Sequence, residues 1–444
     1  MYIYTHKIHT HKELAERKHS NEEMQEKIEE IAQSVDSADS SELKLHHAAS
    51  RGQLEEVRRL IEEQNYNPMD KNEEDDTALH CAALNGHLDI VKYFIEERGL
   101  DPSCWGWHGT TPLHSAAENN HLKVVEYLIS EGLVDPLCRD EVGFTPLHRA
   151  CLGGDIDVIR YLISQTKKHN SMEEVIYLTT NDGNTAVHYA AMSGHLQHII
   201  LFISEFNYDP YTPGYTGRTL LHDAAECGHL DIIKYLIEEQ HCDPSCLDAD
   251  KAIPLHIAAI NGHINVIEYL TKQRRVNPLT KDSNGSTPLH DAALNGRCEL
   301  VKFFISELNC DPNTPGMWDR TPLHYAAQGG SLEAVKWLIE EQHCKPTSLD
   351  DREVTPLHCA TYYGQLNIIK YLIEEQHCDP LCIDQGDRTP LHYAVEYNQL
   401  DTVKYFVQHL KCPTNTRNSA NQTPLDVARK YGHTDVVKYL ESFV

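Results

Sequence analysis

A four-residue phrase, Thr-Pro-Leu-His, constrains the fold of this 444-residue chain more than any other feature. It occurs intact six times, and looser copies complete the series. Its histidine recurs every 34 residues, except for one interval of 40 residues between His148 and His188. A fixed period of about 20–50 residues is the signature of a stacked repeat array. We count twelve units from about Glu42 onward, with the phrase histidine or its equivalent at His46, His80, His114, His148, His188, His222, His256, His290, His324, His358, His392 and Asp426.

The residue types within one unit predict two helices and a projecting loop. Threonine is a favourable N-cap, and the proline after it suits the first position of a helix. An Ala-Ala pair, such as Ala326-Ala327, gives this helix a small face that permits close packing. A second helix follows and ends near an Asp-Pro pair, such as Asp379-Pro380, because proline cannot continue a helix. The turn between the helices needs a residue that tolerates positive φ. Glycine or asparagine stands there at Gly52, Gly86, Asn120, Gly154, Gly194, Gly228, Gly262, Gly296, Gly330, Gly364, Asn398 and Gly432.

The phrase Thr-Pro-Leu-His-x-Ala, the Gly-His pair that follows it and the period resemble the ankyrin repeat. The resemblance covers about nine-tenths of the chain. It implies an all-α solenoid of stacked helix-turn-helix units with short β-hairpin fingers. It also implies that the phrase histidines, and turn histidines such as His229, are structural and bond to backbone between neighbouring units.

Irregularities in the series predict local departures from this pattern. Lys251 and Glu353 replace glycine in two fingers, so we expect those fingers to be distorted or mobile. The fourth unit has six extra residues, which predict a longer second helix or a protruding loop. Atypical residues at the two ends, among them Lys44 and Asp426, are expected in terminal repeats that face water. The expected organisation is a head over 1–41, repeats one to four over 42–164, an insertion-bearing connection over 165–184 and repeats five to twelve over 185–444, with no effector domain after them.

The head, residues 1–41, has a different character. Met24, Ile28, Ile31 and Val35 would share one narrow face of a helix that begins near Ser20. This pattern fits a helix that binds a partner or forms a coiled coil, but two heptads favour instead a helix docked on the first repeat or a partly helical exposed tail. The histidines near its start indicate a tail rather than a metal site.

Charge and hydropathy restrict the partners. The chain carries 67 acidic and 39 basic residues, a formal net charge of −28. Such a field repels phosphate backbones and anionic lipid surfaces, which argues against nucleic acid and membranes as partners. No segment approaches 18 apolar residues, and the N-terminus lacks a hydrophobic signal core. We therefore expect no membrane insertion and a location inside the cell, in the cytoplasm or the nucleus.

The cysteine pattern argues against disulfides and metal sites. Of the fourteen cysteines, Cys104, Cys138, Cys246 and Cys382 recur in one loop setting, one in each repeat. That periodicity indicates a small, partly buried loop position. The C-x3-C spacing of Cys242 and Cys246 is wider than zinc sites prefer. We expect free thiols and no bound metal.

The repeats contain no motif for catalysis. A phosphate-binding loop, a His-Glu-x2-His motif and a Gly-x-Ser-x-Gly motif are all absent from the sequence. We therefore expect no enzyme activity and no cofactor. The sequence favours a scaffold or adaptor that binds a partner protein through the concave groove and finger tips of the array. The alternative is a regulatory or substrate-receptor subunit of an enzyme complex, with the head bound to the catalytic partner.

Aromatic residues at finger and groove positions are the candidate binding residues. Exposed tryptophan and tyrosine are the residue types that most often anchor interfaces. The acidic surroundings favour a partner segment in which lysine or arginine flanks apolar anchors. One set comes from repeats nine to eleven, and a smaller one from repeats three and four. The two sets are Met317, Trp318, Tyr325, Tyr362, Tyr363, Tyr393 and Tyr397, and then Trp105, Trp107 and Phe144.

Overall fold

The computed structural model describes residues 43–131, 133–153, 155–166 and 171–443. The predictions for the head lie outside the described residues, as does the turn at Gly154. Within the described part the twelve predicted units all appear as pairs of helices. The first helices are α2 (Lys44–Ser50), α4 (Ala78–Leu84), α6 (Pro112–Glu118), α8 (Pro146–Gly153), α11 (Ala186–Ser193), α13 (Leu220–Cys227), α15 (Pro254–Asn261), α17 (Pro288–Leu294), α19 (Pro322–Gly329), α21 (Pro356–Tyr362), α23 (Pro390–Glu396) and α25 (Pro424–Tyr431).

The second helices are slightly longer, and four of them end in a π-helical turn that begins at a tyrosine. They are α3 (Leu54–Glu62), α5 (Leu88–Lys92, then Tyr93–Glu97), α7 (Leu122–Ser130), α9 (Ile156–Thr166), α12 (Leu196–Phe206), α14 (Leu230–Glu238), α16 (Ile264–Glu268, then Tyr269–Gln273), α18 (Cys298–Ser306), α20 (Leu332–Glu340), α22 (Leu366–Lys370, then Tyr371–Glu375), α24 (Leu400–Lys404, then Tyr405–His409) and α26 (Thr434–Glu441).

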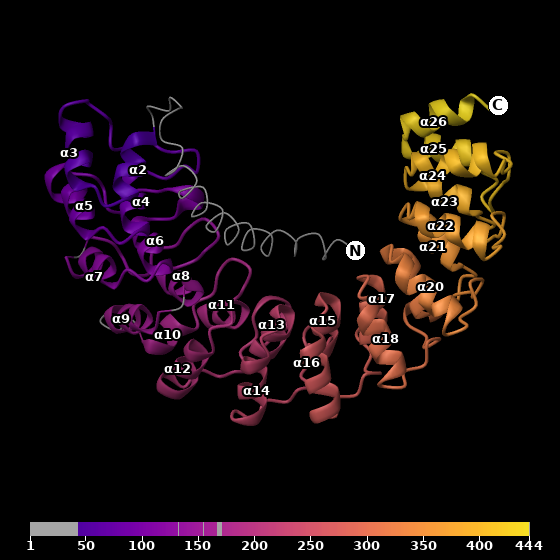
Figure 1. The fold of residues 1–444 in the computed structure, drawn as a ribbon, viewed down its shortest axis with the longest axis horizontal. Helices are drawn as coiled ribbons and strands as arrows, with labels where there is room; N and C mark the ends of the chain where they lie inside the picture. The colour runs from indigo at the N-terminus through magenta and orange to yellow at the C-terminus, as the bar shows by residue number, and fades with distance from the viewer. Residues whose placement is uncertain (1–42, 132, 154, 167–170, 444) are drawn as a thin grey trace. The chain divides into compact units, whose positions relative to one another are not determined.

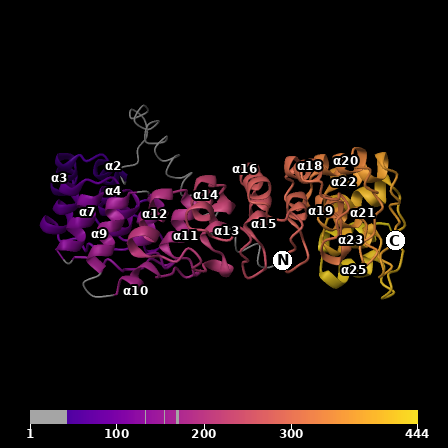
Figure 2. The same cartoon turned by 90° about the horizontal axis from the view of Figure 1, so that it is seen from below.

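The chain forms two compact units, Met1–Trp107 and His108–Val444. In the second unit each first helix packs against the first helix of the next repeat. Figures 1 and 2 show α11, α13 and α15 in one row and α12, α14 and α16 in another. The alanine pairs of the first helices are completely buried at these contacts, as at Ala326 and Ala327. The small side chains therefore permit the close stacking that the sequence predicts.

The turn between paired helices has the predicted conformation. Asn120 and Asn398 have φ values of 66° and 57°, and the described turn glycines also have positive φ. In the second unit a side chain just after the turn residue bonds back to the preceding repeat. His229 Nε2 lies 3.0 Å from the Met192 carbonyl oxygen, and Arg297 Nε donates to the Ile260 carbonyl at 3.1 Å. Each of these bonds ties one repeat to the repeat before it.

The extra residues of the fourth repeat come with an additional helix rather than with an unusually long second helix. Helix α9 has 11 residues, the same as α12 of repeat five, which has no insertion. A short additional helix, α10 (Met172–Ile176), follows, capped by the Ser171 hydroxyl. Helices α8 and α11 still pack together across the insertion. The insertion therefore lies inside the second unit, and a block boundary at 165–184 stays a prediction.

The fingers are tight turns rather than the expected β-hairpins. Among the described residues the only β-pairing outside helices is two isolated bridges, Lys71 with Thr77 and Thr179 with Thr185. In five fingers an aspartate side chain, and in two an asparagine side chain, bonds the backbone N–H groups of the turn. Asp350 Oδ1 accepts hydrogen bonds from the backbone N–H groups of Arg352 and Val354, at 2.9 and 2.8 Å.

Lys251 and Glu353 do not distort their fingers. Both take the left-handed conformation, with φ of 58° and 60°, at the position where Gly285 has φ of 80°. The closing bond is also kept, because Lys251 N–H donates to the Asp248 carbonyl at 3.0 Å and Glu353 N–H to that of Asp350 at 3.1 Å. Whether these fingers are mobile stays a prediction.

Candidate functional site

Most of the phrase histidines use both ring nitrogens in the scaffold, whereas in repeat one only Nε2 of His46 is bonded. In repeat nine the Thr321 N–H donates to His324 Nδ1 at 3.2 Å, and His324 Nε2 lies 3.1 Å from the Val354 carbonyl oxygen. These two bonds place the proton of the neutral ring on Nε2. Burial lowers the pKa of His324 to about 4, and the same holds for His358. A histidine fixed in this way is a poor general base at neutral pH.

Four tyrosines gather at the ends of the first helices of repeats ten to twelve. The ring centroid of Tyr362 lies 3.7 Å from that of Tyr397 and 4.5 Å from that of Tyr363. Tyr397 is 38% exposed, and Tyr431 on the next repeat is 47% exposed. We call Tyr362, Tyr363, Tyr397 and Tyr431 the tyrosine cluster. It offers aromatic surface to solvent on three consecutive repeats.

Tyr431 was missed by the sequence reasoning, although the repeat period could have found it. Tyr363, Tyr397 and Tyr431 are each 34 residues apart, directly before the turn residue. The same position in earlier repeats holds Arg, Asn, Gly, Ser or Cys. In the last repeat the atypical charged residues, which indicate a terminal repeat, are the stronger sequence signal. Arg429 and Lys430 are indeed exposed, as a terminal repeat requires.

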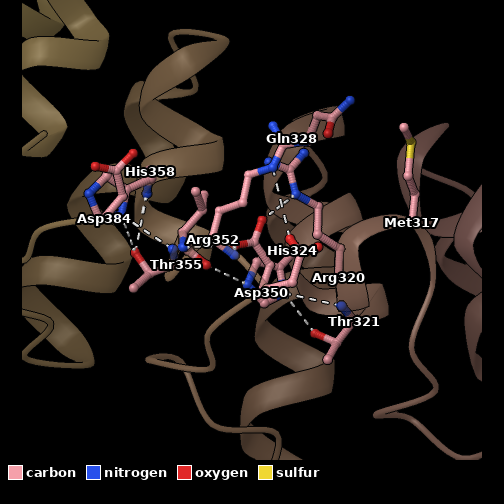
Figure 3. Close-up of polar contacts among 12 residues, drawn as sticks. Met317, Arg320, Thr321, His324, Gln328, Asp350, Arg352, Thr355, His358 and Asp384 are labelled. Carbon is pink, nitrogen blue, oxygen red and sulfur yellow. Dashed lines mark hydrogen bonds and ion pairs between the residues drawn. The ribbon is translucent and has the colours of Figure 1, made fainter. Parts of the chain in front are cut away.

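Trp318 lies in the finger before repeat nine, between two arginines. The guanidinium carbons of Arg352 and Arg320 lie 4.0 and 5.0 Å from the centroid of its ring. Arg320 Nε also donates to Asp350 at 2.9 Å, which holds one arginine in place. Figure 3 shows the two arginines close together beside Asp350, with the Met317 side chain farther away. The contacts with these two arginines thus hold the half-buried Trp318 side chain in place.

Two tyrosines of the predicted set lie inside the stack instead of on its surface. Tyr325 is 8% exposed, and its hydroxyl lies 2.9 Å from the Ser286 hydroxyl oxygen. Tyr393 is 5% exposed and donates to Asp384 at 2.8 Å. Both follow a phrase histidine, a position that faces the neighbouring repeat. Both tyrosines pack beneath the exposed residues, and their side chains have almost no solvent-exposed area that a partner could contact.

The smaller predicted set divides between the two compact units. Trp105 and Trp107 both belong to the first unit. Trp105 is 68% exposed, whereas Trp107 is half-buried and its backbone N–H donates to Asp76 at 3.0 Å. Phe144 belongs to the second unit and is only 6% exposed, with the guanidinium carbon of Arg149 4.5 Å above its ring. Phe144 is therefore a packing residue, because the adjacent repeat covers it.

The cysteines are free thiols in the described structure. The four periodic ones are partly buried, and each sulfur lies near a phrase threonine, as at 3.5 Å between Cys246 and Thr219. Among the described residues one group with metal-ligand chemistry occurs, Cys298 with Glu299 and Glu333. Lys302 lies between the two carboxylates, 2.9 Å from Glu299 and 3.0 Å from Glu333. The lysine ammonium thus pairs with both carboxylates and offsets part of their charge. No helix in the described ranges is long and apolar enough to cross a membrane.

Stacked helix pairs with buried structural histidines and an exposed aromatic face define a helical-repeat solenoid whose surface residues are left for binding. The family description "Ankyrin repeats (3 copies)" matches residues 20–104, 99–174, 167–248, 236–316, 308–384 and 376–442. The chain therefore belongs to the ankyrin repeat family. Comparison with the curated proteins finds no match. Ankyrin repeats generally serve as protein–protein interaction modules and are typically non-enzymatic.

Proposed function

We propose that this protein is a non-catalytic scaffold or adaptor that binds a partner protein through the tyrosine cluster and the adjacent fingers of repeats nine to eleven. The observation that carries the proposal is the tyrosine cluster itself. Three consecutive repeats place tyrosine where repeats two to nine have small or amide side chains and repeat one has Arg51. Tyrosine presents a large rigid ring at low entropic cost, and such residues dominate the binding energy of many interfaces.

The charge around the cluster supports a partner segment with basic and apolar residues. The three fingers 316–320, 350–354 and 384–388 carry six acidic and three basic side chains. Two of the three arginines are already engaged, Arg320 with Asp350 and Arg388 with Asp384 at 2.7 Å. The surface that remains is acidic, and electrostatic complementarity then favours lysine or arginine beside the apolar anchors of the partner.

The proposal places the protein inside the cell and assigns it no catalytic partner. The alternative role as a subunit of an enzyme complex depends on residues 1–41, which lie outside the described part of the chain. Trp105 and Trp107 remain a second, smaller contact site in this proposal. Trp105 is the most exposed large apolar residue of the described chain, which supports its inclusion.

Affinity capture with matched variants tests the proposed function. The intact chain, a Trp318→Ser/Tyr363→Ser/Tyr397→Ser variant and a control Leu247→Ser/Leu279→Ser variant would each be used as bait in a cell lysate. The control leucines are exposed to similar degrees, 54% and 48%, but lie on other repeats. We expect a specific protein that the first variant loses and the control retains. Equal capture by all three baits, with unchanged helical circular dichroism, would refute the proposed surface.

A further inference from the structure

We infer that the tyrosine cluster and Glu396 bind an arginine side chain of the partner segment. This inference rests on the proposed function and names the residue that its central site takes. The cluster surrounds one carboxylate, since Glu396 directly precedes Tyr397 and accepts a hydrogen bond from the Tyr431 hydroxyl at 3.2 Å. A planar cation that stacks on Tyr397 could reach this carboxylate at the same time.

The neighbouring repeats already use this chemistry with their own arginines. The Arg352 guanidinium carbon lies 4.0 Å from the ring centroid of Trp318, and that of Arg388 lies 4.5 Å from Tyr393. Arg388 also donates two hydrogen bonds to Asp384, at 2.9 and 2.7 Å. A guanidinium over an aromatic ring with a carboxylate at its edge is therefore an arrangement that this surface makes repeatedly.

Glu396 is only partly neutralised within the chain. Its second oxygen lies 3.6 Å from Arg388, too far for a good hydrogen bond. Arg388 is turned toward Asp384 and the hydroxyl of Tyr393 instead. Among the described residues no lysine or arginine forms a cation–π contact with the Tyr397 ring. An exposed ring and an incompletely paired carboxylate thus lie side by side.

Repeat six has an arginine and a glutamate at the same two positions as repeat eleven, but no tyrosine after the glutamate. It therefore serves as a comparison for the site in repeat eleven. Arg218 and Glu226 stand at the positions of Arg388 and Glu396, and their side chains form a direct hydrogen bond. Arg218 is mostly buried, at 6% side-chain exposure against 35% for Arg388, whereas the two glutamates are almost equally buried, at 14% and 17%. The residue after Glu226 is Cys227 rather than a tyrosine. The arginine–glutamate pair therefore occurs in both repeats. In repeat eleven the two side chains are 3.6 Å apart, and a tyrosine follows the glutamate.

Arginine fits this site better than lysine. Its flat, weakly hydrated guanidinium can stack on a ring and donate two parallel hydrogen bonds to one carboxylate. The lysine ammonium is a compact and strongly hydrated charge that cannot do both. The site should therefore distinguish the two cations.

The test uses the full chain as bait for a displayed library of random peptides, followed by affinity measurements on the most enriched peptide. We expect enriched peptides to carry an arginine. Replacement of that arginine by lysine, or Glu396→Gln in the protein, should weaken binding about tenfold. Tyr397→Ala should weaken it to a similar extent. Glu226→Gln is the matched control and should leave the affinity unchanged.

Three results would overturn the inference. Enriched peptides without arginine, equal affinity for lysine, or binding insensitive to Glu396→Gln would each show that the cluster does not recognise a guanidinium. In those cases, binding that is still lost in the Trp318→Ser/Tyr363→Ser/Tyr397→Ser variant leaves the proposed function in place. If the library yields no peptide that depends on the cluster, both the inference and the proposed function fail.

Discussion

One histidine in each of most repeats holds together two levels of structure. Its Nδ1 accepts from the backbone that caps its own helix, and its Nε2 bonds to the loop that leads into the next repeat, as at 3.1 Å between His222 and Ala252. The Nδ1 bond needs the neutral ring, because protonation would place a hydrogen on Nδ1 opposite the capping N–H, whereas Nε2–H donates in either state. The role of this histidine could be predicted from the sequence, since the family resemblance implied it.

The buried histidines predict that acid destabilises the fold. Burial lowers the pKa of His188, His222, His290, His324 and His358 to about 4. The unfolded chain, with a histidine pKa near 6.5, binds protons first as the pH falls. The free energy of unfolding should therefore decrease from about pH 6.5 toward pH 4, by roughly 1–2 kcal/mol per histidine between pH 7 and 5. Urea unfolding at a series of pH values measures this; a flat profile from pH 7 to 5 would contradict it.

The finger aspartates give a second prediction at the scale of a residue. Asp350 holds the turn through its Oδ1 and pairs with Arg320 through its Oδ2, and its side chain is fully buried. Asp350→Asn should keep the turn, because Asn418 makes the same two turn bonds in its own finger. We expect a loss of about 1–2 kcal/mol for Asp350→Asn and about 3 kcal/mol or more for Asp350→Ala. Thermal unfolding compares them; equal losses would show that the turn bonds contribute nothing.

At the scale of an element, the sequence predicted helices well and fingers poorly. Capping threonines, prolines and turn glycines are local signals, so the helix pairs could be placed from the sequence. The fingers were expected to be β-hairpins, but the aspartate side chain satisfies the backbone groups that strand pairing would use. Glu340 and Glu374, exposed at the ends of second helices, accept hydrogen bonds from Tyr371 and Tyr405, at 2.8 and 2.7 Å, across one repeat.

Close helix packing depends on one glycine in repeat nine. A Cβ atom at Gly329, at the end of α19, would overlap the Leu294 carbonyl oxygen of α17. Glycine to alanine usually stabilises a helix, but here we expect Gly329→Ala to destabilise the protein by about 2 kcal/mol or more. Gly285→Lys is the control and should cost about 1 kcal/mol or less, since Lys251 occupies that position in the preceding repeat. Chemical denaturation ranks the variants, and a neutral Gly329→Ala would refute the packing argument.

At the scale of the whole molecule, the repeat stack determines what is exposed. Tyr325 directly follows its phrase histidine and is covered by a neighbouring finger, whereas Tyr362 stands four residues after its phrase histidine and lies in the exposed cluster. Periodicity gives the position of a side chain within its repeat. It does not give the partner that covers it in the next repeat. The sequence could therefore locate the region of the site but not separate its surface residues from its supports.

The same burial protects the thiols of the whole chain. Nine of the fourteen cysteines are buried and the others partly so. Burial raises the pKa of Cys138 and Cys382 to about 12, which leaves little thiolate at neutral pH. A thiol reagent such as Ellman's reagent should react slowly with the native protein and with fourteen thiols after denaturation. A rapid native reaction of many thiols, or a lower count after denaturation, would contradict the structure.

Site-specific photocrosslinking tests the central claim most directly. A benzoylphenylalanine would replace Tyr397 in one form of the full chain and Leu247 in a control form, and each would be irradiated in cells or lysate. The account predicts a crosslinked partner protein at position 397 that is absent at position 247. It also predicts that Trp318→Ser/Tyr363→Ser in the same chain removes this crosslink. A partner that crosslinks at 247 and not at 397 would show that binding uses another face of the array.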